Sequence, residues 1–142
     1  MLDLNLVAAY DLARRTAAVS GHQGTSIINI ASILGLVSGA PLGGAAYAAS
    51  KAGLLGLTRE LAGQWARHGI RCNALVPGWF RTEMTHELFA DERSADWVRR
   101  NTMLRRPGDV SELDGALLFL ASPASSFCTG QAIVVDGGWT AR

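Results

Sequence analysis

A tyrosine and a lysine four positions apart, in the segment YAASKAGLLGL (residues 47–57), are the side chains whose spacing first suggests chemistry. In a helix this spacing places Tyr47 and Lys51 on one face. A free phenol titrates near pH ~10, and an ammonium group within about 4–6 Å lowers its pKa by about 1–3. Tyr47 could then donate and accept a proton at neutral pH. The structural alternative is a tyrosine that covers the core and a lysine that reaches water.

Ser32 is the third candidate, because it ends a short segment that is typical of a buried strand. The segment SIINIAS (26–32) is rich in β-branched residues, too short for a helix and apolar enough for burial on both faces. Ligands of parallel sheets bind beyond the carboxyl ends of the strands, where the helix of Tyr47 and Lys51 also begins. The Ser32 hydroxyl could bind the reacting oxygen of a carbonyl or alcohol, or it could only cap the loop. Because no side chain carries a hydride, reaction at such a centre implies a nicotinamide cofactor.

The apolar periodicity predicts the elements that would position these residues. We expect a helix over 2–19, a turn at 21–25, the strand at 26–32, a loop over 33–44, a helix over 45–67, a strand over 70–76, two short helices within 79–104, a helix near 109–121 and a strand over 131–138. On the first helix, the residues that suit one face are Leu2, Leu6, Tyr10, Leu12 and Val19. This alternation predicts an α/β fold with a parallel sheet.

Composition limits the classes of partner. The chain has 142 residues, of which 49% are hydrophobic and 18% charged, and this suits one domain over 1–142. The formal net charge is +1 and the basic residues are scattered, so we expect no nucleic acid and no membrane as a partner. The thiols and histidines lack the spacing of a metal site, and the two cysteines indicate a reduced, cytoplasmic protein. These residues are Cys72, Cys128, His22, His68 and His86.

Taken together, the ordered motifs of the chain resemble the short-chain dehydrogenase/reductase family. The matching segments are LNLV with Asn5, INIAS with Ser32, YAASK, NALVPGWFRTEM with Asn73, and TGQAIVVDGG. They span essentially the whole chain. The resemblance implies a partial Rossmann-like, doubly wound parallel sheet, consisting of the last three strands with their flanking helices. It also implies the C-terminal catalytic half of an NAD(P)-dependent oxidoreductase that interconverts an alcohol and a ketone or aldehyde.

The resemblance also implies roles for single residues. Tyr47 would be the catalytic acid and base, Lys51 would lower its pKa and hold the nicotinamide ribose, and Ser32 would orient the substrate oxygen. Asn5, the fourth catalytic residue, would maintain a kink in the backbone and an ordered water for proton relay. The loop from Pro77 to Thr82 would lie along the nicotinamide of NAD or NADP. The cofactor contacts in that loop would come from Pro77, Gly78, Phe80 and Thr82.

The segment 79–104 would then form a lid over the substrate. Trp79 and Met84 would contact the substrate in this lid, and its aromatic residues favour an apolar alcohol or ketone over a sugar phosphate. In the family, helices that correspond to 2–19 and 45–67 commonly form a dimer interface, so the resemblance implies a homo-oligomer. Asn5 and Asn73 also have structural alternatives, a solvated position and a partner for backbone groups.

Two features depart from the family pattern. Fifteen positions separate Ser32 from Tyr47, somewhat more than is usual, and a Gly-rich loop can absorb the excess. The sequence also has no strand, glycine-rich turn and helix that would hold a cofactor pyrophosphate. The alternative function is therefore a truncated, non-catalytic remnant or a dimerising interaction module. A serine hydrolase that uses Ser32 is excluded, because no G-x-S-x-G motif is present.

Overall fold

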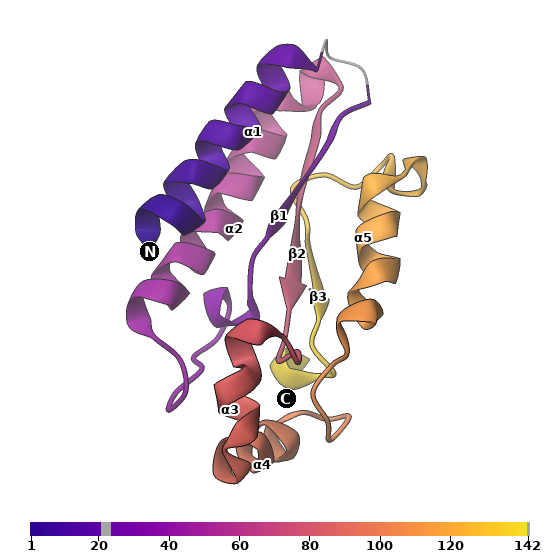
Figure 1. Ribbon diagram of the computed structural model, residues 1–142. Helices are drawn as coiled ribbons and strands as arrows, with labels where there is room; N and C mark the ends of the chain where they lie inside the picture. Colours follow the sequence, from indigo (N-terminus) through magenta and orange to yellow (C-terminus); the bar gives the residue numbers. More distant parts are fainter. Residues whose placement is uncertain (21–23, 142) are drawn as a thin grey trace.

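The computed structural model describes residues 1–20 and 24–141 of the chain. Most of the expected turn at 21–25, with His22, lies outside the described residues. The strands are β1 (Ser26–Ile30), β2 (Arg71–Pro77) and β3 (Ala132–Val135). The α-helices are α1 (Ala8–Val19), α2 (Ala45–Trp65), α3 (His86–Ala90), α4 (Glu92–Asn101) and α5 (Asp114–Ala121), and a π-helical turn (Asp3–Val7) precedes α1 (Figure 1).

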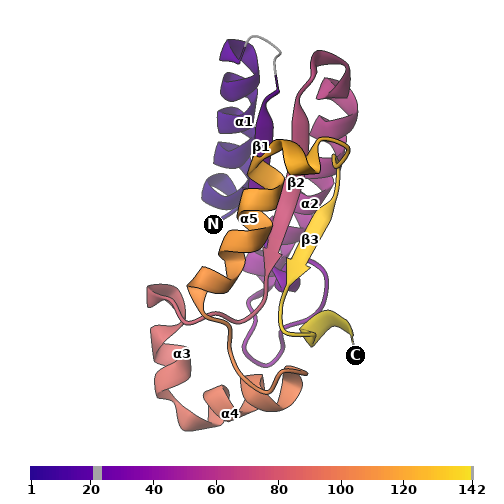
Figure 2. The same ribbon diagram turned by 90° about the vertical axis from the view of Figure 1, so that its right-hand side faces the viewer.

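The three strands form one parallel sheet in the order β1-β2-β3. Helices α1 and α2 cover one face of the sheet and α5 covers the other, as Figures 1 and 2 show from two directions. The expected doubly wound α/β arrangement is confirmed. The short helices α3 and α4 lie beyond the carboxyl ends of the strands, where a ligand of such a sheet would bind.

The central strand β2 is buried along most of its length, whereas β1 and β3 are edge strands. The expectation that the first strand is buried on both faces is wrong at its end, because Ile30 is 48% exposed. β2 pairs with only one side of β1, so the other side of β1 remains an open edge of the sheet. An apolar open edge of this kind can pair with another chain.

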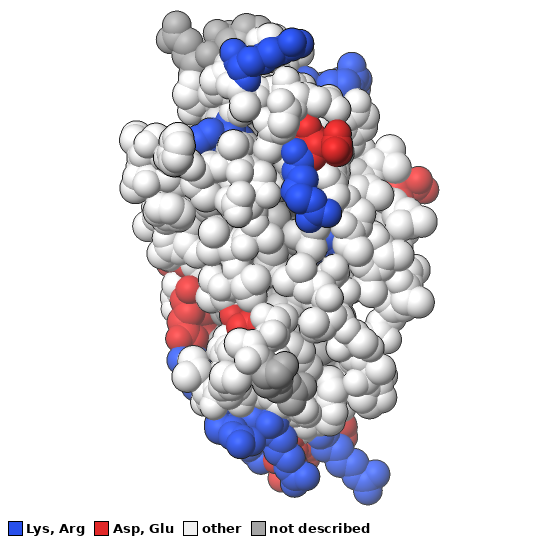
Figure 3. Space-filling view, turned by 180° about the vertical axis from the view of Figure 1, so that it is seen from behind, with Lys and Arg blue, Asp and Glu red and all other residues white. Residues whose placement is uncertain are grey.

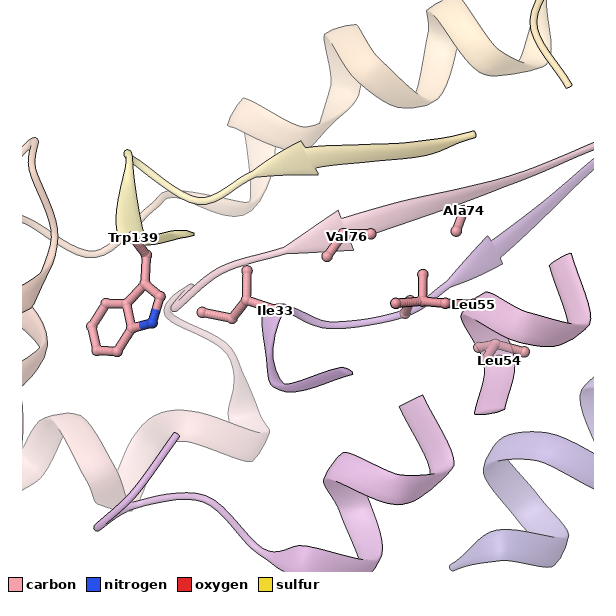
Figure 4. Close-up of a cluster of buried hydrophobic side chains, with 7 residues drawn as sticks. Ile33, Leu54, Leu55, Ala74, Val76 and Trp139 are labelled. Carbon is pink, nitrogen blue, oxygen red and sulfur yellow. The ribbon is translucent and has the colours of Figure 1, made fainter. Parts of the chain in front are cut away.

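The largest buried cluster lies between the sheet and α2. It joins Ile33, Leu54, Leu55 and Val76 to Trp139, which comes from the last turn of the described chain (Figure 4). Since Ile33 directly follows Ser32, the same cluster fixes the loop that carries the candidate serine. The end of the described chain therefore meets the loop after β1 beside Ser32.

The first helix does not bury the face that its periodicity predicts. Leu2, Tyr10, Leu12 and Val19 are 49%, 45%, 68% and 84% exposed. Leu6, Ala9 and Ala13 form the face that packs inward, Leu6 and Ala9 on the cluster of Ile33 and Ala13 on a second cluster with Leu61. A π-helical turn holds more residues than an α-helical turn, so Asp3–Val7 shifts the face of the residues around it.

Asn73 was expected, in its structural alternative, to be a partner for backbone groups. The amide of Asn73 bonds the backbone, donating to the Cys128 carbonyl at 2.8 Å and accepting from Gln131 N–H at 3.0 Å, so its structural role is confirmed. On the face that Figure 3 shows, charged side chains gather toward the two ends, with a mostly uncharged band between them. In the part of the chain that the structure describes, no helix is long and apolar enough to cross a membrane.

Candidate active site

A cavity of about 380 Å³ opens at the carboxyl end of the sheet and brings two of the candidate residues together. Ser32 and Tyr47 both line it, one from the loop after β1 and the other from the first turn of α2. Gly78 and Trp79 line it from the segment after β2. The remaining wall comes mainly from Ile33, Leu34, Leu42, Met84, Thr85 and Leu88.

Ser32 is nearly buried and held in an extended conformation at the start of a short 3₁₀ turn. Its Oγ accepts a hydrogen bond from Leu34 N–H at 3.2 Å. The serine therefore does cap the loop, as the structural alternative proposed. A hydroxyl that accepts one bond still has its own proton to donate, so capping orients Ser32 without using up the group that a substrate oxygen needs.

Tyr47 and Lys51 lie one turn apart on α2, as the spacing predicted. The Lys51 Nζ lies 5.6 Å from the centroid of the Tyr47 ring. It also donates a hydrogen bond to the Ile30 carbonyl at 2.8 Å, which ties α2 to the end of β1. Burial lowers the pKa of the Lys51 ammonium from its ordinary value.

Asn5 does not line the cavity of Ser32 and Tyr47. It lies in the adjoining groove beside the open edge of β1, which Lys51 and Ile30 also line. The Asn5 Nδ2 donates to Ser50 Oγ at 3.0 Å, and Ser50 Oγ donates to the Tyr47 carbonyl at 2.7 Å. Asn5 lies within the π-helical turn, and the completely buried Ser50 links that turn to the first turn of α2.

Gly35 sets how closely the serine loop approaches α2. A Cβ at this position would lie 2.7 Å from the Lys51 carbonyl carbon and 2.9 Å from Ala52 N. Both atoms belong to the backbone of a long helix and cannot move aside. The loop that carries Ser32 therefore rests directly on the helical turn that carries Lys51.

The residues of the loop after β2 that were expected to bind the cofactor have surroundings that differ from one residue to the next. Gly78 donates to the Val135 carbonyl at 2.9 Å, which joins the carboxyl ends of β2 and β3, and Pro77 ends β2. The Phe80 ring is 6% exposed and packs on Gly108, away from the cavity. Thr82 is exposed and caps the following turn through Thr85, whose Oγ1 lies 3.1 Å from the Thr82 Oγ1.

Several residues that shape the site carry no sequence signal of their own. Leu34, Leu42 and Leu88 line the cavity but read as ordinary loop or helix residues. Ser50 could have been found, because it stands three positions after Tyr47 and so lies on the same helical face. No cluster of side chains suited to a metal ion occurs among residues 1–20 and 24–141.

The donor set at this edge fits the nicotinamide half of a dinucleotide. Lys51 presents an ammonium with three donors, one of which is bonded to Ile30, and a ribose offers hydroxyl acceptors. Tyr47 and Ser32 face a cavity large enough for a small alcohol or ketone. Together they can hold and protonate an oxygen.

Comparison with known proteins agrees with this chemistry. A sequence-family model described as Enoyl-(Acyl carrier protein) reductase matches residues 1–140. The gluconate 5-dehydrogenase of Gluconobacter oxydans (strain 621H) is 47% identical over 80% of this chain and 44% of its own length.

Two solved structures share the fold closely. One is a gluconate 5-dehydrogenase from Burkholderia cenocepacia J2315 in complex with NADP and tartrate, with 39% identity, a TM-score of 0.88 and coverage of 97% of this chain and 54% of that one. The other is 4-hydroxyisoleucine dehydrogenase complexed with NADH, with 37% identity, a TM-score of 0.92 and coverage of 99% and 58%. The chain thus spans about half the length of the relatives it matches. With its parallel sheet, its YAASK helix and a family match over residues 1–140, the chain belongs to the short-chain dehydrogenase/reductase family.

Proposed function

We propose that this chain supplies the catalytic and substrate-binding part of an NAD(P)-dependent oxidoreductase that interconverts an alcohol and a ketone or aldehyde. The observation that carries the proposal is the convergence of Ser32 and Tyr47 on one cavity, with the Lys51 ammonium 5.6 Å from the Tyr47 ring. A nicotinamide cofactor, when bound, supplies or accepts the hydride that no side chain can carry. The relatives with NADP and NADH support either cofactor.

In the reductive direction, the Ser32 and Tyr47 hydroxyls donate to the carbonyl oxygen of the substrate and fix it in the cavity. The Tyr47 hydroxyl gives its proton to this oxygen as negative charge develops there. The Lys51 ammonium stabilises the phenolate that forms, because a positive charge near the ring favours the anion. In the oxidative direction, the phenolate takes the alcohol proton.

Three other parts of the chain support this arrangement. Lys51 would hold the nicotinamide ribose through the donors that Ile30 does not use. Asn5 would keep the first turn of α2 in place through Ser50. The loop from Pro77 to Thr82 would border the nicotinamide; because the Phe80 ring packs on Gly108, its backbone rather than its ring would make that contact.

The substrate that suits this cavity is uncharged and moderately apolar. The described residues that line it include Leu34, Leu42, Trp79 and Leu88, and no side chain among its described lining residues carries a charge. A carboxylate placed there would lose its hydration without gaining a cationic side chain as a partner. We therefore infer a neutral alcohol or ketone, in contrast to the sugar acids in the names of several relatives.

The alternative is a non-catalytic dimerising module of the same fold, and the two tyrosines of the chain allow a direct test. Turnover of the natural polypeptide would be followed by NADH and NADPH absorbance with small ketones. Tyr47→Phe removes the proton donor and should lower kcat about 10²- to 10⁴-fold. Tyr10→Phe changes an exposed residue of α1 and should leave kcat at the wild-type value. Equal activity of the two variants would contradict the proposal.

A further inference from the structure

Three tryptophans from distant parts of the sequence meet behind the cavity. Trp79 follows β2, Trp97 lies on α4, and Trp139 lies in the last turn of the described chain. The ring centroids of Trp97 and Trp139 are 5.0 Å apart, those of Trp79 and Trp139 are 5.7 Å apart, and those of Trp79 and Trp97 are 6.2 Å apart. All three pairs have the edge-to-face geometry that aromatic rings prefer.

Within this cluster, Trp79 is the ring that lines the cavity. Its indole nitrogen is buried and has no hydrogen-bond partner among the described residues. No hydrogen bond through its N–H therefore fixes the orientation of this ring. What holds it is packing, and the aromatic part of that packing comes from Trp97 and Trp139.

Trp139 is the most buried member of the cluster. It is 3% exposed and packs in the core with Ile33, the neighbour of Ser32 (Figure 4). The turn that presents it is fixed by the Asp136 carboxylate, which accepts from Gly138 N–H at 2.8 Å and from Thr140 N–H at 2.8 Å. Trp139 thus packs behind two parts of the cavity, the wall that Trp79 forms and the loop that carries Ser32.

We propose that Trp139 is a positioning residue that sets the depth and shape of the substrate cavity by holding Trp79, although it does not line the cavity itself. This inference rests on the proposed function, because it assigns the substrate wall of that same site. A smaller residue at position 139 would leave Trp79 free to swing into the vacated space. The cavity would deepen, and small substrates would be held less firmly, while Tyr47 and Lys51 would stay in place.

The kinetic test uses the natural full-length polypeptide, both cofactors, and acetone, cyclohexanone and acetophenone as probe ketones. In Trp139→Leu we expect the KM of acetone to rise about tenfold relative to that of acetophenone, and the pH profile of kcat to stay unchanged. Trp65→Leu is the matched control, since Trp65 packs on the separate cluster of Ala13 and Leu61. If the ratio of the acetone KM to the acetophenone KM were the same in Trp139→Leu and Trp65→Leu, the inference would be overturned.

A second readout needs no activity. In a Trp65→Phe background, Trp139→Leu and Trp139→Phe both leave Trp79 and Trp97 as the emitting rings of residues 1–142, so the two variants compare the same emitters. Quenching by acrylamide should be about twofold greater in Trp139→Leu, because Trp139→Phe keeps an aromatic packing partner and is the safer variant to fold. Equal quenching in these two variants would contradict the inference, whereas a wild-type enzyme that reduces none of the ketones would contradict the proposed function alone.

Discussion

Gly35 is a residue beside the site that leaves no room for a side chain. Any side chain there meets the backbone of α2 at Lys51 and Ala52, at 2.7 and 2.9 Å. We expect Gly35→Ala to cost about 1–3 kcal/mol in the free energy of unfolding through overpacking. Because relief requires the Ser32 loop to move, kcat/KM should fall about tenfold to a hundredfold. Thermal unfolding and steady-state kinetics measure the two effects.

The matched control for this prediction is Gly115→Ala on α5. A Cβ at Gly115 meets nothing within 4 Å, so alanine should stabilise this helix by up to about 1 kcal/mol and leave kcat/KM unchanged. If Gly35→Ala behaved like Gly115→Ala, the close contact between the serine loop and α2 would not be what positions Ser32.

At single residues, the sequence was informative wherever chemistry follows from local spacing. Tyr47 and Lys51 share a helical face because they are four positions apart, and Ser32 lies two residues beyond the end of β1. The contacts between Asn5 and Ser50 and among the three tryptophans could not be predicted, since they join positions far apart in the sequence. Ser50 is 45 positions from Asn5. Only the path of the chain through the fold brings such residues together.

Among the elements, the start of α5 has the most distinctive charge arrangement. Asp109 caps the 3₁₀ turn Val110–Leu113 that leads into α5, and the Glu112 carboxylate accepts from Asp109 N–H at 2.8 Å. Both Glu112 oxygens also accept from the Arg106 guanidinium, at 2.7 and 2.6 Å. The Arg106 hydrogen bonds, with that from the Asp109 backbone, lower the pKa of Glu112 to about 2.

This lowered pKa gives a pH prediction with a definite sign. A carboxyl group whose pKa is lower in the folded state stabilises the fold above its unfolded pKa, near 4.5, and this stabilisation is lost as the pH falls toward about 2. We expect Glu112→Gln to lower Tm at pH 6 and to remove part of the loss of Tm between pH 5 and pH 2. Arg106→Gln should give the same change. A Glu112→Gln curve parallel to that of the wild type over this range would contradict the prediction.

The periodicity predicted the order and type of the elements, but not where they end or which side chains of α1 face inward. The strand predicted at 131–138 is only Ala132–Val135, because Asp136 to Gly138 form the turn that presents Trp139. The helix predicted near 109–121 begins with a 3₁₀ turn. The π-helical turn near Asn5 changes which side chains of α1 face inward, and hydrophobic spacing counted at a constant helical period could not reveal it.

At the scale of the whole molecule, α1 and α2 present an outer surface suited to a second copy of the chain. The two helices lie side by side on one face of the sheet (Figure 1). Val7 at the end of the π-helical turn and Val19 of α1 are 56% and 84% exposed. On α2, Ala49 and Ala52 are exposed, and a Cβ at Gly56 would meet nothing within 4 Å. Small residues allow a partner helix to approach closely, and exposed valines supply apolar area, so we expect these helices to form the interface of a homo-oligomer.

The variant Gly56→Glu tests this interface without weakening the subunit. Glutamate is a better helix former than glycine by roughly 0.5 kcal/mol or more, so the isolated subunit should not be destabilised. In the interface, however, it would bury a charge beside its symmetry copy, which is unfavourable. Sedimentation velocity over a range of concentrations should show an oligomer for the natural polypeptide and monomers for Gly56→Glu. Gly115→Glu makes the same change on α5, across the sheet, and should remain oligomeric. A wild type that sediments as a monomer at every concentration would contradict the homo-oligomer itself. A Gly56→Glu variant that stays associated would place the interface on another surface.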